Sequence, residues 1–146
     1  MSKVEDFLTS EEEKEIVEAI GIAEKNTSGE IRVHIEKENS IAPIDRAVAV
    51  FHQLNMEKTK ERNGVIIYVA VKSKHFAIYG DEGIHDKVGD DFWDTTKDIM
   101  MTHFKMGNFK QGLIDGVLKA GEQLQKHFPH HDDDTNQLSN EISIGE

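Results

Sequence analysis

The chain has 146 residues, of which 37% are hydrophobic, so it can bury one ordinary core and is expected to form a single domain. Its formal net charge is −11, from 28 acidic and 17 basic residues, and this charge repels phosphate backbones and anionic lipid head groups. Nucleic acids and membrane surfaces are therefore excluded as expected partners, whereas cations are favoured. Because the chain has no cysteine, a disulfide framework, a thiolate zinc site and a cysteine nucleophile are excluded as well.

A first helix is expected from about Ser10 to Asn26. Ser10 and Glu13 have the spacing of a capping box, and apolar residues recur behind them at helical intervals. After a turn, residues 30–37 alternate between apolar and polar side chains. This pattern is typical of a strand with one wet or partly covered face.

A second helix is expected to begin at Pro43, whose missing amide hydrogen suits a first turn, and to end near Asn55. The run from Val65 to Val71 is continuously apolar and β-prone, as expected of a central strand buried on both faces. Residues 75–79 follow after a short polar link, a length that suits a β-hairpin.

Beyond the third strand lies a loop rich in glycine and acidic residues, residues 80–91. Apolar residues at helical spacing then predict two more helices, which are divided at Gly107-Asn108 and end before Pro129. Residues 1–129 are assigned to one domain. Residues 130–146 are polar and lack periodicity, so they are expected to form a disordered tail.

The expected order of elements is α-β-α-β-β-α-α. The first two strands are joined through a helix and should be parallel, with the third antiparallel to the second. Helices on both faces of this short mixed sheet would complete a three-layer α/β/α sandwich, so the predicted fold class is α/β. The N-terminus has no apolar signal-peptide core and the longest apolar run is too short to span a bilayer, which favours a cytoplasmic location.

This topology brings three loops to one end of the sheet, because the third strand ends where the first two begin. Calcium takes about six to eight oxygen ligands, commonly from carboxylates and carbonyls on loops. The sequence therefore predicts a divalent-metal site of the calcium type, with magnesium or another divalent ion as alternatives. The candidate ligands are Asp81, Glu82, Asp86, Asp90, Asp91 and Glu30, with Asn63 as a further oxygen donor. The competing interpretation is an acidic stretch that only complements the dipole of the following helix.

Four segments of the chain, in the same order, resemble the TPM domain, a family named after a thylakoid lumen protein, a photosystem repair protein and a receptor-modulating membrane protein. They are AEKNTSGEIRV at residues 23–33, RNGV at 62–65, GDEGIH at 80–85, and GNF at 107–109 leading to Gly112 and Leu113. The resemblance covers about residues 7–128. It implies an α/β/α sandwich and a calcium or other divalent ion at the loop cluster, and some members are associated with acid phosphatase activity.

Three functions remain open. The first is a non-catalytic binding or regulatory module in which a divalent ion orders the acidic loops. The second is a metal-assisted acid phosphatase with Asp81 as a metal ligand and His85 or Arg62 near the phosphate. The third is a metal-independent interaction protein, with an unknown protein partner, that uses the strand face carrying Arg32 and His34. No recognisable hydrolytic motif is present, so catalytic residues are unassigned and the first function is favoured.

Overall fold

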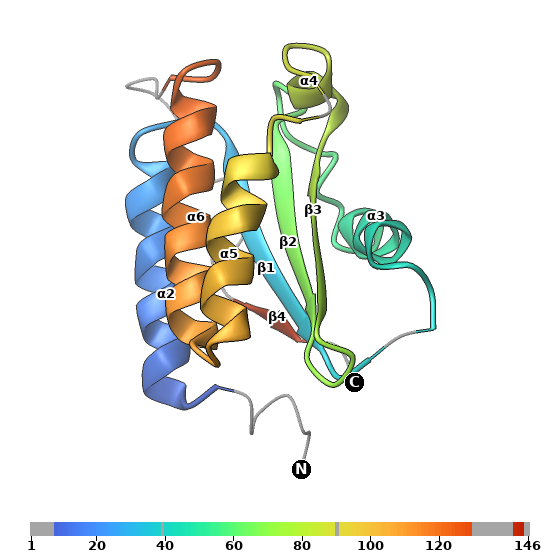
Figure 1. Ribbon diagram of the computed structural model, residues 1–146. Coiled ribbons are helices and arrows are strands. Elements are labelled where there is room, and N and C mark those ends of the chain that lie inside the picture. The colour runs from blue at the N-terminus through green and yellow to red at the C-terminus, as the bar shows by residue number, and fades with distance from the viewer. Residues whose placement is uncertain (1–7, 39, 90, 130–141, 145–146) are drawn as a thin grey trace.

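A short sheet with helices on both faces forms the body of the protein in the computed structural model, which describes residues 8–38, 40–89, 91–129 and 142–144 (Figure 1). One face of the sheet is covered by three helices and the other by a single helix. On the first face lie α2 (Ser10–Glu24), α5 (Asp94–Lys105) and α6 (Phe109–Gln125), and on the second lies α3 (Pro43–Gln53). The predicted three-layer α/β/α sandwich is confirmed.

The strand order in the sheet is β3-β2-β1-β4. Strands β1 (Glu30–Glu36) and β2 (Gly64–Ala70) are parallel, and β3 (His75–Gly80) returns antiparallel to β2. Every residue of β2 is buried, as its unbroken apolar run predicts. The expected order of elements and the mixed pairing are therefore both confirmed.

A two-residue strand, β4 (Ser143–Ile144), pairs parallel with β1 at His34 and Ile35. It lies in the segment expected to be a disordered tail. Residues 130–141 and 145–146 of that segment lie outside the described residues, so the prediction is not tested there. Two residues are too few to show the alternation by which a strand is recognised in a sequence.

Helix α2 begins at Ser10 as predicted, but its N-cap is the residue before, Thr9. The Thr9 hydroxyl accepts a hydrogen bond from the Glu12 backbone N–H at 3.1 Å, while Glu12 Oε1 accepts one from the Thr9 N–H at 3.0 Å. The assignment of this capping box to Ser10 and Glu13 was wrong. Both pairs fit the same spacing, because two hydroxyl residues are followed by three glutamates, and the sequence alone does not choose between the registers.

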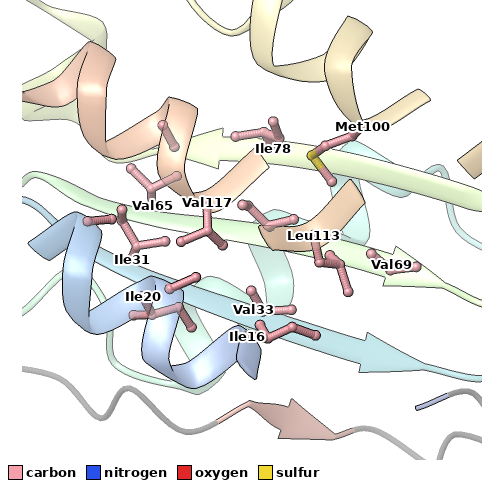
Figure 2. Close-up of a cluster of buried hydrophobic side chains, with 14 of the residues drawn as sticks. Ile16, Ile20, Ile31, Val33, Val65, Val69, Ile78, Met100, Leu113 and Val117 are labelled. Carbon is pink, nitrogen blue, oxygen red and sulfur yellow. The ribbon is translucent and has the colours of Figure 1, made fainter. Parts of the chain in front are cut away.

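The main core lies between the sheet and the three helices α2, α5 and α6. Figure 2 shows Ile16 and Ile20 of α2 facing alternate residues of β1 and β2, with Val117 of α6 close by. A second, smaller cluster fills the space between the sheet and α3, around Phe51 and Tyr68. The strand positions that face the two cores therefore alternate, which fixes the register of the sheet.

The loop after β3 contains a short helix, α4 (Glu82–His85), which the sequence pattern does not predict. Helix α5 then begins at Asp94, and the apolar residues Val88 and Phe92 lie before it. Within the described residues, no helix is both long enough and apolar enough to cross a lipid bilayer.

Candidate functional site

Three loops meet at the end of the sheet where β1 and β2 begin and β3 ends, near α4 in Figure 1. Backbone hydrogen bonds tie them together. The Glu30 N–H donates to the Asn63 carbonyl at 3.3 Å, and the Asp81 N–H donates to the Gly64 carbonyl at 2.9 Å. The predicted convergence of these loops is confirmed, with Glu30 and Asp81 on opposite sides of the start of β2.

Asp81 is 1% exposed and is held by Arg62. The Arg62 guanidinium donates to both carboxylate oxygens, with Nε 2.8 Å from Oδ2 and Nη2 3.1 Å from Oδ1. Oδ1 also accepts a hydrogen bond from the Glu82 N–H at 2.8 Å, so Asp81 is the N-cap of α4. Both of its oxygens are thus engaged, and binding of a metal by Asp81 would require Arg62 to move.

The other predicted acidic ligands lie mostly in solvent. Glu82 is exposed and its carboxylate lies 3.1 Å from Arg62 Nη1, while Asp86 and Asp91 are also exposed. Asp90 lies outside the described residues. In the part of the chain that the structure describes, no three acidic or histidine side chains are grouped so that they could hold a metal ion.

The loop that carries Arg62 is tightly constrained. Arg62 has a φ of 51°, in the left-handed region that non-glycine residues rarely adopt. Its carbonyl accepts a hydrogen bond from the Gly83 N–H at 2.9 Å, and a Cβ on Gly83 would lie only 2.1 Å from the Glu61 carbonyl oxygen. Glycine at position 83 is therefore what allows α4 to pack directly on this loop.

Replacing Gly83 with alanine is expected to separate α4 from the loop at residues 61–62. The clash is with backbone atoms, so it cannot be relieved by a side-chain rotation, and a loss of about 2–4 kcal/mol in the free energy of unfolding is expected. Urea denaturation of G83A and wild type measures this loss. The matched control is Gly89→Ala, because a Cβ there has a nearest neighbour at 3.2 Å, one oxygen of the Asp91 side chain. Equal stabilities of the two variants would contradict the assignment.

A second pair of carboxyl groups, Glu24 and Glu30, lies at the same end of the sheet. Glu24 is at the end of α2, and its Oε2 accepts a hydrogen bond from the Ile31 N–H at 2.8 Å. Glu30, at the start of β1, is 4% exposed. Burial, together with the charge of Glu30 and a hydrogen bond to it, raises the pKa of Glu24 to about 9, although the backbone hydrogen bond from Ile31 acts in the opposite direction. At neutral pH Glu24 therefore holds a proton.

Asn63 is 1% exposed and lies next to the start of β1, since its backbone carbonyl accepts a hydrogen bond from the Glu30 N–H. Its side-chain amide donates to Ser28 Oγ at 3.2 Å and to Glu61 Oε2 at 3.4 Å. Its Oδ1 is buried and makes no hydrogen bond with the described residues. A buried oxygen without a donor is unfavourable by about 1–3 kcal/mol, so its position calls for a bound ion or water.

The sequence predicts Glu30 and Asn63 as candidate ligands, but Glu24 lies outside the acidic loop on which that prediction was based. The available signal is its position in the last turn of a helix, six residues before the first residue of a strand. A connection this short keeps the end of the helix close to the start of the strand. Two glutamates at such a spacing are therefore candidates for a carboxyl pair.

A separate polar network is buried on the α3 side of the sheet, centred on Glu36. Its carboxylate accepts hydrogen bonds from the Arg46 guanidinium at 2.9–3.3 Å and from the Tyr68 hydroxyl at 2.5 Å. His34 Nε2 lies 3.0 Å from Glu36 Oε1, and His34 Nδ1 lies 2.9 Å from Ser143 Oγ. His34 is only 5% exposed, so the strand face proposed for a protein partner is covered at this position.

The fold and site together define a small α/β/α domain with buried carboxyl groups where its strands begin. The chain belongs to the TPM domain family, whose model matches residues 1–123. The resemblance of its four sequence segments to that family is confirmed.

Solved structures agree with this assignment. The chain is 62% identical to the BA42 protein of the psychrophilic bacterium Bizionia argentinensis, with a TM-score of 0.92, over 99% of this chain and 100% of that one. It also resembles the N-terminal domain of a P. gingivalis protein, at 20% identity and a TM-score of 0.68, over 86% of this chain and 82% of that one. A third similar structure is the N-terminal domain of cg2496 from Corynebacterium glutamicum, at 13% identity and a TM-score of 0.62, over 95% and 80% of the two chains. The last two show the fold alone. A search of the curated proteins finds no match.

Proposed function

We propose that this TPM domain binds a divalent cation of the calcium type at the end of the sheet where β1 and β2 begin, and that it acts as a non-catalytic binding or regulatory module. The ligands are the carboxylates of Glu24 and Glu30 and the side-chain oxygen of Asn63. Two observations support the proposal: Glu24 and Glu30 form a carboxyl pair in which burial favours the protonated form, and the buried side-chain oxygen of Asn63, a residue whose backbone carbonyl binds the Glu30 N–H, makes no hydrogen bond with the described residues.

The chemistry of these groups fits a hard cation. All three supply oxygen atoms, and they come from the end of α2, the start of β1 and the residue before β2. Without a cation, the two carboxyl groups avoid repulsion only by retaining a proton. A divalent ion replaces that proton and neutralises both charges. Calcium is favoured over magnesium because calcium accepts irregular arrangements of oxygens, whereas magnesium requires a nearly ideal octahedron.

The acidic loop has a supporting role in this proposal. Asp81 fixes α4 and Arg62 against the sheet, and the exposed carboxylates of Glu82, Asp86 and Asp91 add to the negative potential that attracts a cation. Direct coordination by these residues, or by Asp90, stays a prediction. The net charge of −11 acts in the same direction.

Thermal unfolding of chelator-treated protein with and without about 1–5 mM calcium tests the proposal, because a ligand that binds only the native state raises the melting temperature. A rise is expected for wild type and for Glu18→Gln, a control at an exposed position of α2. No rise is expected for Glu30→Gln. If wild type shows no rise with calcium or magnesium, the proposal fails.

The acid phosphatase alternative gains no support from the positions of its candidate residues. Arg62, the expected phosphate ligand, is bound to Asp81 and Glu82, and His85 is exposed on α4. The alternative stays a prediction. An assay with a generic aryl phosphate and calcium, magnesium, manganese or zinc would detect phosphatase activity. Turnover by wild type that the Arg62→Lys substitution abolishes would support the phosphatase alternative.

A further inference from the structure

A small apolar pocket lies at the other end of the sheet, between the β2–β3 hairpin and the junction of α5 and α6. Its volume is about 240 Å³. Its walls come from the end of β2, the start of β3 and the helix junction, and include Phe76, Phe104 and Phe109. The rings of Phe76 and Phe104 meet edge to face, with centroids 5.3 Å apart. The pocket is thus an apolar hollow with aromatic walls.

The charged residues that line this pocket are basic. Lys74 and Lys105 belong to its lining and both are exposed, while no acidic side chain is among the lining residues that the structure describes. This local balance is opposite to that of the whole chain, which carries −11. An apolar pocket with ammonium groups at its mouth is complementary to a ligand that has a hydrophobic body and one negative charge.

The backbone at Lys74 supports the same assignment. Lys74 has a φ of 58°, in the left-handed region where glycine or asparagine is favoured. It is in the turn of the β2–β3 hairpin, where glycine would relieve the strain. A lysine therefore occupies a position that the turn itself does not require, and its side chain lines the pocket.

We propose that this pocket binds a small hydrophobic monoanion, a carboxylate or sulfonate attached to one aromatic ring system or a short acyl chain. The apolar part lies against the phenylalanine rings, and Lys74 and Lys105 bind the anionic group. The pocket is smaller than the roughly 300–1,000 Å³ of sites for drug-sized ligands, which excludes large ligands. The site is independent of the cation site, which lies at the opposite end of the strands.

The test uses fluorescence titration with 5-dimethylaminonaphthalene-1-sulfonate, a monoanion with one aromatic ring system, followed by competition with octanoate, on the full chain in the presence of chelator. Saturable binding that octanoate reverses is expected for wild type. Lys74→Gly should weaken binding about fivefold or more, since it removes one charge contact, while its melting temperature equals or exceeds that of wild type. Lys105→Gln should weaken binding similarly, which provides a second variant that leaves the hairpin unchanged.

Two controls make the outcome decisive. Lys25→Gln removes an exposed lysine at the end of α2 that is not part of the pocket, and its affinity should match that of wild type. Octanol, which has the same acyl chain without the charge, should compete at least fivefold more weakly than octanoate. Equal affinity of Lys74→Gly, Lys105→Gln and Lys25→Gln would overturn the proposal, as would binding that does not saturate.

Discussion

Replacing Glu36 with alanine is expected to lower the free energy of unfolding by about 3–5 kcal/mol, because it removes the shared acceptor of a buried network. The Glu36 side chain is 3% exposed and accepts hydrogen bonds from Arg46 and from the Tyr68 hydroxyl. Without it, the Arg46 guanidinium and the Tyr68 hydroxyl lose their partner on the α3 side of the sheet. Urea denaturation monitored by circular dichroism measures the loss.

Glu38→Ala is the matched control, because Glu38 lies two residues further along the chain in an ion pair with Lys72 whose side chains are 51% and 58% exposed. Exposed pairs contribute little, so this variant should lie within about 0.5 kcal/mol of wild type. A Glu36→Ala variant as stable as Glu38→Ala would show that the network does not hold α3 to the sheet.

The pH dependence of stability gives a further check on Glu36. Burial acts to raise the pKa of its carboxyl, but hydrogen bonds from Arg46, Tyr68 and His34 outweigh burial and lower that pKa to about 2. A lowered pKa stabilises the fold above the unfolded-state value near 4.5, and this contribution is lost as the pH falls from about 4.5 toward 2. Wild type should therefore lose more stability than Glu36→Gln over this acidic range.

Replacing Glu24 with glutamine is expected to have opposite effects with and without calcium. Without metal, the variant removes the carboxyl that burial and Glu30 disfavour in its charged form, so a gain of about 1–3 kcal/mol at neutral pH is expected. The amide oxygen of glutamine can still accept the hydrogen bond from the Ile31 N–H. With calcium, the same variant lacks one of the two negative charges that bind the ion, so its metal-induced rise in melting temperature should be smaller than that of wild type.

The sign of the pH effect at Glu24 is the reverse of that at Glu36. A raised carboxyl pKa stabilises the protein below about 4.5, and that contribution is lost as the pH rises toward 9. Metal-free wild type should therefore become less stable over this range relative to Glu24→Gln. Thermal unfolding at several pH values in chelator measures the difference. A constant difference between the two proteins would contradict the buried carboxyl pair.

Much of the fold is predictable because its signals are local. The unbroken apolar run of β2 and the alternation in β1 give the type of each strand, and the short hairpin gives their directions. The two-residue β4 and the four-residue α4 have no such signals, since neither is long enough to show a period. The position of α4 depends instead on tertiary packing, such as the close approach of Gly83 to the loop before β2.

The candidate site is less predictable than the fold. The predicted strand directions show at which end of the sheet the three loops meet, and this identifies Glu30 and Asn63 as candidate ligands. Clustering of acidic residues in the sequence favoured the loop after β3, yet the structure pairs Asp81 with Arg62, 19 residues away, through a left-handed turn that no sequence period encodes. Glu24 becomes a candidate only once the end of α2 is placed against the start of β1.

The most direct test of the cation site is a calcium titration of isotope-labelled, chelator-treated protein, followed through its backbone amide NMR signals. Saturable shifts are expected for residues 24–31 and 61–64, which surround Glu24, Glu30 and Asn63, and they should be absent in Glu30→Gln. Shifts confined to residues 82–91 would place the ion in the acidic loop. That result, or no shift at millimolar calcium, would contradict the proposed site.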